Sequence, residues 1–143
     1  MRQDYNFFRD TATGFPLILR NHDTGQLLTP SDVQSISYSI YTVDSPLGNT
    51  ETPVEGFIDV PIEIEGFLFD TLKTTQVQDR FGTRGMQYNF RFATAKQMAD
   101  IEGVNTLVYP FPVRGNWYRV RITFNLNDAS LPPLVVTIPG LCV

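Results

Sequence analysis

Apolar and polar residues alternate with a period of two along two stretches of the chain, residues 33–43 and 117–126. In the first stretch, Ile36, Tyr38 and Ile40 alternate with serines. In the second, five apolar residues alternate with polar or amphipathic ones: Tyr118, Val120, Ile122, Phe124 and Leu126. Because successive side chains of a strand point to opposite faces, both stretches predict β-strands with one buried and one exposed face.

Three further stretches predict strands of the same kind. Residues 86–92 alternate apolar with polar side chains, residues 15–20 are mainly apolar, and residues 134–138 follow a turn rich in Asn, Asp and Pro. The last of these is expected to return beside the preceding strand as a hairpin and to end at Pro139 and Gly140.

The middle of the chain is less regular. Residues 56–60, 62–64 and 67–69 are short pieces interrupted by Pro61 and Gly66, a pattern typical of edge strands or of a strand with a bulge. The polar segment 45–53 predicts an exposed loop, and residues 94–100, with Thr94 as N-cap, predict one short helix.

These elements predict an all-β fold of about seven to eight strands with one short connector helix. Short strands without alternating long helices favour an antiparallel immunoglobulin-like β-sandwich, with a small β-barrel as the alternative. A length of 143 residues suits one domain, expected over residues 15–143. Residues 1–14 contain Tyr5, Phe7 and Phe8 and are expected to form an arm that packs on this or a neighbouring subunit.

The net charge and the cysteine content limit which kinds of partner and which cellular compartment the sequence favours. The net charge of -4 gives no electrostatic reason to expect nucleic acid or an anionic membrane as partner. No apolar run approaches the roughly 18 residues that a membrane span needs. A single cysteine, Cys142, cannot form an internal disulfide, which favours a reduced, cytoplasmic protein.

The sequence resembles known folds and modules at two places. Residues 115–122, followed by the Pro-rich turn and residues 134–138, resemble the last two strands of immunoglobulin-like and fibronectin type III-like domains. Tyr118 matches the corner tyrosine of that family, and Val120 stands where antibody domains have a core cysteine. Residues 28–40 resemble small structural proteins encoded among phage and prophage genes.

The second resemblance implies a function and a location. Such modules serve as capsid decorations, head-tail joining proteins or tail components. The chain is therefore expected to be a non-enzymatic virion subunit, present in many copies and assembled in the host cytoplasm. Its expected partners are other virion proteins or copies of itself, with no small-molecule substrate and no specific nucleic acid. A carbohydrate-binding or surface-binding sandwich module is the alternative function.

Candidate catalytic and metal-binding residues are few. His22 is the only imidazole, lies in a polar turn and is not accompanied by a well-placed nucleophile. Glu63 and Glu65, two apart on a predicted strand, would hold carboxylates roughly 6–7 Å apart, but such a pair more simply marks the solvated face of an edge strand. No Cys-X-X-Cys or His-X-X-His spacing exists, so no metal site, cofactor or catalytic residue is predicted.

One exposed surface is the candidate interface. Trp117, Arg119 and Arg121 are expected on the outward face of their strand, joined by Asn89 and Arg91 if those two strands pair. Exposed Trp and Arg are enriched at interface hot spots. The aromatic residues of the arm, Tyr5, Phe7 and Phe8, extend this predicted interface.

Overall fold

The computed structural model describes residues 5–9, 13–21, 23–74 and 87–143. Strands make up nearly all of its regular structure, with one 3-10 turn, η1 (Pro30–Asp32), before β3. The strands are β1 (Tyr5–Phe7), β2 (Thr13–Leu17), β3 (Val33–Val43), β4 (Glu51–Pro53), β5 (Val60–Ile62), β6 (Leu68–Thr74), β7 (Gln87–Thr94), β8 (Gln97–Ile101), β9 (Val104–Val108), β10 (Trp117–Leu126) and β11 (Leu134–Cys142).

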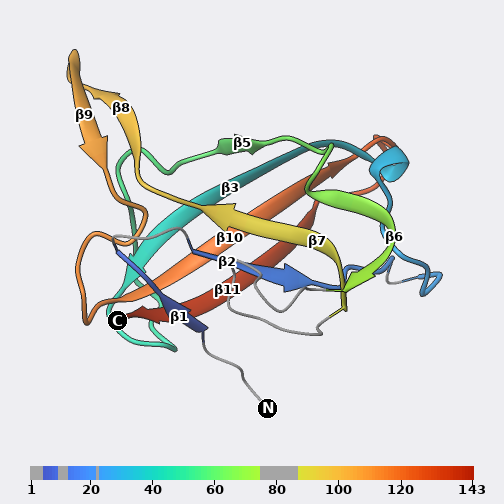
Figure 1. Cartoon of the computed structure of the whole chain (residues 1–143), viewed down its shortest axis with the longest axis horizontal. Helices are drawn as coiled ribbons and strands as arrows, with labels where there is room; N and C mark the ends of the chain where they lie inside the picture. The colour runs from blue at the N-terminus through green and yellow to red at the C-terminus, as the bar shows by residue number, and fades with distance from the viewer. Residues whose placement is uncertain (1–4, 10–12, 22, 75–86) are drawn as a thin grey trace.

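Two sheets face each other, and a small hairpin stands apart from them (Figure 1). The larger sheet has the order β1-β11-β10-β3-β4, with β5 also paired to β3. The smaller sheet has the order β2-β7-β6, and β8 and β9 form a two-stranded sheet. Because the two sheets are separate in the described residues, the predicted all-β sandwich is confirmed and the barrel alternative is not supported.

The alternation in β3 and β10 explains why these strands lie at the centre of the larger sheet. Their antiparallel register places Val120 opposite Ile40 and Ile122 opposite Tyr38, so that the apolar faces of both strands line the core together. Rings from the two sheets then meet across the core: Phe90 of β7 lies edge-on to Phe124, with ring centroids 5.1 Å apart.

The strand order is that of an immunoglobulin-like domain. β11, β10, β3 and β4 stand in the order of strands G, F, C and C′, and β2, β7 and β6 in the order of B, E and D. The corner tyrosine is also present, since the backbone N–H of Val113 donates to the Tyr118 hydroxyl at 2.9 Å. This bond ties the loop before β10 to the start of that strand.

Several details differ from the sequence prediction. Residues 94–100 were predicted as a helix, but β7 runs to Thr94 and β8 begins at Gln97. Pro139 does not end β11, which continues to Cys142, and the parallel pairing of β1 with β11 makes the sheet mixed rather than purely antiparallel. Tertiary packing therefore outweighs local propensity at these points.

The N-terminal segment is part of the sandwich where the structure describes it. Phe7 is fully buried, and its ring stacks on Phe111 at a centroid distance of 4.1 Å. Just beyond β1, the Nε of Arg9 donates to the carbonyl of Pro112 at 2.9 Å, and its guanidinium lies over the Tyr109 ring. The arm was expected to pack either on its own subunit or on a neighbouring one. The described residues of this segment pack on their own subunit.

Candidate functional site

The outward face of β10 carries the predicted interface residues. Trp117, Arg119 and Arg121 are all half-buried, while the residues between them are in the core. The register places Arg119 between Tyr41 of β3 and Pro139 of β11. The prediction that this face points away from the core is confirmed.

The two arginines of β10 are held by a single carboxylate from β4. Arg119 Nη1 lies 3.1 Å from Oε2 of Glu51, and Arg121 Nη2 lies 2.8 Å from the same oxygen. Arg119 also donates to the carbonyl of Gly48 at 2.8 Å, and Arg121 lies over the Tyr41 ring at 4.9 Å. Much of their hydrogen-bonding capacity is thus used within the chain, where it attaches β4 to the sheet.

The charge balance of this cluster follows from the same contacts. Burial by itself would raise the pKa of Glu51, but hydrogen bonds from Arg121 and Arg119 outweigh it and hold that pKa below its ordinary value. The hydrogen bond to Glu51 in turn raises the pKa of Arg121. The cluster is therefore fully ionised at neutral pH, with one net positive charge among these three residues.

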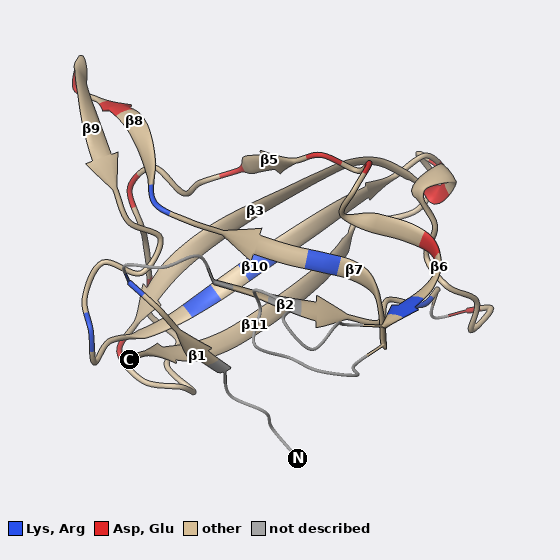
Figure 2. Cartoon of the chain, in the orientation of Figure 1, with Lys and Arg blue, Asp and Glu red and all other residues tan. Residues whose placement is uncertain are grey.

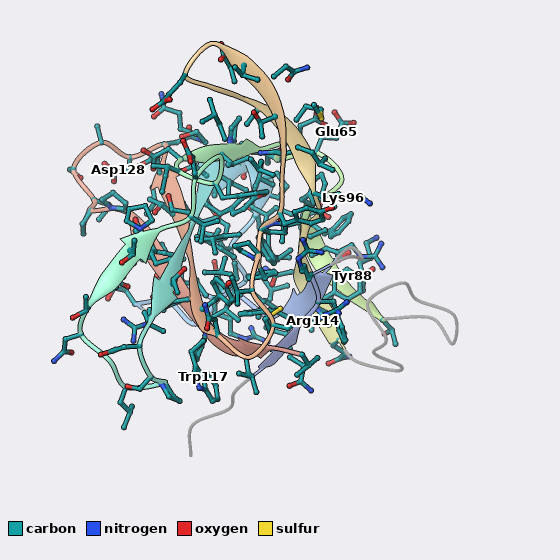
Figure 3. All side chains as sticks on the ribbon, turned by 90° about the vertical axis from the view of Figure 1, so that its left-hand side faces the viewer. Glu65, Tyr88, Lys96, Arg114, Trp117 and Asp128 are labelled. Atoms are coloured by element: carbon teal, nitrogen blue, oxygen red, sulfur yellow. The ribbon has the colours of Figure 1, made fainter. Side chains whose placement is uncertain are left out.

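Trp117 borders a shallow groove at the start of β10. Figure 3 places its side chain at the margin of the molecule, away from the core. The groove has a volume of about 310 Å³. Its polar lining comes from Thr42, Asp44, Thr50, Thr52 and Asn116. Asp44, Thr50 and Thr52 are exposed to solvent.

The remaining predicted interface residues do not join this face. Arg91 lies on β7, which pairs with β2 and β6 rather than with β10, and its guanidinium is 4.9 Å from the centre of the Tyr88 ring. Figure 2 shows the basic segments of β7 and β10 on different sheets. Phe7 belongs to the core and Phe8 is partly exposed, whereas the side chain of Tyr5 lies outside the described residues.

Asn89, expected on the same surface, is also placed elsewhere. It is fully buried. Its Oδ1 accepts a hydrogen bond from the N–H of Leu19 at 2.6 Å, and its Nδ2 donates to the carbonyls of Leu19 and Leu28, each at 2.9 Å. Asn89 therefore holds the segment between β2 and β3 against β7, and it is not available to a partner.

The β8–β9 hairpin is a second exposed surface, which the sequence prediction missed. Its two strands rise away from both sheets (Figure 1). Met98, Val104 and Leu107 are 55%, 62% and 44% exposed. The signal in the sequence was the dipeptide Glu102-Gly103, flanked by β-branched residues, which is typical of a two-residue hairpin turn.

The residues that the sequence offered as candidates for catalysis or metal binding are not brought together in the described parts of the chain. No group of three His, Cys, Asp or Glu side chains is close enough to hold a metal ion in this part of the chain. Glu63 and Glu65 were predicted on one strand, but β5 ends at Ile62 and both lie in the turn that follows. Cys142 is buried against the Phe111 carbonyl, and His22 lies outside the described residues.

Comparison of the chain with protein-family models, with curated proteins and with solved structures gave no match. In the described ranges, no helix has the length and apolarity that crossing a membrane requires. Function is therefore inferred from the two exposed surfaces and from the resemblances in the sequence.

Proposed function

We propose that the protein is a non-enzymatic structural subunit that acts through protein–protein contacts, in a tailed phage or phage-like particle. The observation that carries this proposal is the β8–β9 hairpin, which presents apolar side chains to solvent on an element that projects from the sandwich (Figure 1). Adjacent exposed apolar residues on a projecting element are typical of binding surfaces, because solvent exposure of such residues has no benefit to folding.

The packing of the hairpin supports this role. On one face of the hairpin, Ala99 and Ile101 are partly buried and pack against the core. On the other face, Met98 and Leu107 are exposed. The particle itself is proposed from the resemblance of residues 28–40 to phage and prophage structural modules. Localisation in the virion, after assembly in the host cytoplasm, belongs to the same proposal.

The test uses native, untagged protein purified from its source. Mass photometry and negative-stain imaging are expected to find it in large, regular particles, together with many copies of itself or with other structural proteins. Recovery as a monomer in every fraction, with no particle association, would contradict the proposal.

Carbohydrate binding at the Trp117 groove is the second candidate. The observation that favours it is the combination of an indole ring with Asp44, Asn116 and three threonines around one shallow hollow. An aromatic ring can pack against the C–H face of a sugar while carboxylate, amide and hydroxyl groups bond its hydroxyls. A glycan array probed with the wild type and with Trp117→Ala tests this function. Signals that are absent, or equal for both proteins, would exclude it.

A further inference from the structure

We infer that the β8–β9 hairpin docks into an apolar hollow at the opposite end of a second copy of the same chain, so that copies join head to tail. This inference rests on the proposed assembly function and names its partner. Figure 1 shows the hairpin at one end of the longest axis of the domain, and the elements that line the hollow, which are the end of β10, the start of β11 and the segment after β2, toward the other end. One copy can therefore use both surfaces at once.

A tight turn and contacts at its base fix the position of the hairpin relative to the sandwich. Its turn residues Glu102 and Gly103 both have positive φ, 52° and 81°, as the tight two-residue turn of a twisted hairpin requires. At its base, Gln97 donates to the carbonyl of Gly56 at 3.0 Å. A Cβ on Gly56 would lie 2.7 Å from Val108, so the base of the hairpin is in close contact with the sandwich.

The face of the hairpin turned away from the sandwich has an apolar pair followed by acidic residues. Met98 lies directly opposite Leu107, and the next pair toward the tip on this face is Asp100 opposite Asn105. Figure 2 shows acidic segments on the hairpin. A binding site for this face must accept two apolar side chains and place positive charge near the tip.

The hollow at the other end has this composition. It has a volume of about 250 Å³ and lies between the segment after β2 and the turn that joins β10 to β11. Its apolar lining consists of Leu28, Leu126, Leu131, Pro132, Pro133 and Leu134. Leu131 is 44% exposed at its border, so a substantial apolar surface is open to solvent there.

The charges at the rim set the orientation of docking. Arg20 lines the hollow, and its Nη1 donates to the carbonyl of Gly25 at 3.0 Å, which leaves its other donors available. Asp23 lies on the same rim. The acidic tip residues Asp100 and Glu102 would therefore approach on the side of Arg20 and away from Asp23. This opposite charge offsets part of the repulsion between chains that each carry a net charge of -4.

Head-to-tail contacts of this kind are heterologous, because two different surfaces of each copy meet. Such contacts close into a ring if the rotation between copies permits it, and otherwise extend into a filament. Either outcome is a repeating assembly made from one type of chain. The proposed structural function requires such an assembly if the chain is its own partner.

Two variants test the inference, one at each surface. Met98→Asp disables the hairpin, and Leu131→Asp disables the hollow. Wild type is expected to form oligomers whose mass grows with concentration in light scattering, whereas each variant alone stays monomeric, with association weakened on the order of 30-fold as for a hot-spot residue. An equimolar mixture of the two variants is expected to form dimers and nothing larger, because each keeps one intact surface.

The matched control is Leu47→Asp, the same kind of change at a residue that is 79% exposed and lies outside both surfaces. It is expected to leave the oligomers unchanged. Circular dichroism melting of every variant shows whether the sandwich is intact. Dimers in the mixture of the two variants also require folded protein, because each variant must present its one intact surface. Arg20→Glu and Glu102→Arg are each expected to weaken association and, combined in one chain, to restore it.

Wild type that remains monomeric at its highest soluble concentration would overturn the inference, and so would oligomers that persist in both Asp variants. The proposed function is tested separately by particle association of the native protein. If native protein is found in particles while purified protein is monomeric, the function stands and the hairpin binds another structural protein instead of a second copy.

Discussion

The buried amide of Asn89 makes a sharp prediction about folding stability. It accepts from the Leu19 N–H and donates to the carbonyls of Leu19 and Leu28. The Leu19 carbonyl has a second donor, the N–H of Leu28, so removal of the amide leaves chiefly the Leu19 N–H and the Leu28 carbonyl without this partner. At about 1–3 kcal/mol for each of these two buried orphans, Asn89→Ala should lower the free energy of unfolding by about 2–6 kcal/mol.

Asn89→Asp separates this hydrogen-bonding argument from a loss of packing, because the side chain keeps its size. A carboxylate would place a second oxygen against two carbonyl oxygens, so the protonated acid is favoured in the folded state and the pKa of Asp at this position is raised. The unfolded chain has the ordinary value of about 3.9. Stability is therefore retained below this pH and is lost, by about 1.4 kcal/mol per pH unit, as the pH rises toward the raised folded pKa.

Urea unfolding of wild type, Asn89→Ala and Asn89→Asp at several pH values between 3 and 8 measures these differences. The wild-type amide does not titrate, so the difference between wild type and Asn89→Asp should widen as the pH rises. A constant difference across this range, or an Asn89→Asp variant as stable as wild type at pH 7, would refute the assigned hydrogen bonds.

Three other substitutions test parts of the structure described above. Phe7→Ala removes a fully buried ring and should cost about 3–5 kcal/mol in urea unfolding, whereas a loose arm would give a change near zero. Tyr118→Phe leaves the Val113 N–H without its acceptor and should cost about 1–2 kcal/mol in the same assay. Glu51 stabilises the fold above its ordinary pKa of 4.5, and this contribution is lost as the pH falls through its lowered folded pKa. Glu51→Gln should therefore flatten the acid side of the stability profile, and an unchanged slope would contradict the arginine contacts.

The central strands could be predicted from the sequence because their alternation is local. The period of two in residues 33–43 and 117–126 defines both the strands and the faces that they bury. The role of Tyr118 was expected from the resemblance to immunoglobulin-like domains, and its hydroxyl bonds a residue only five positions away. These features depend on neighbouring residues, which the sequence displays directly.

Features that depend on distant residues were missed. The partnership of Glu51 with Arg119 and Arg121 joins residues 68 and 70 positions apart, and no local pattern indicates it. Asn89 alternates with residues of the core in sequence, yet it is buried because the segment after β2 crosses it. The β8–β9 hairpin was missed for a different reason, because residues 94–100 include good helix formers, whose local propensity predicts a helix where the chain forms a strand.

The pairing of β1 with the end of β11 has a consequence for the order in which the sandwich forms. Tyr5 meets Gly140, so this contact closes a loop that spans most of the described chain, whereas β10 and β11 form a local hairpin. Closure of such a long loop has a high entropic cost until the strands between are already packed. β1 should therefore join after the transition state for folding, and Phe7→Ala should accelerate unfolding while leaving the folding rate almost unchanged. The packing of this short strand therefore slows unfolding and lengthens the lifetime of the folded state.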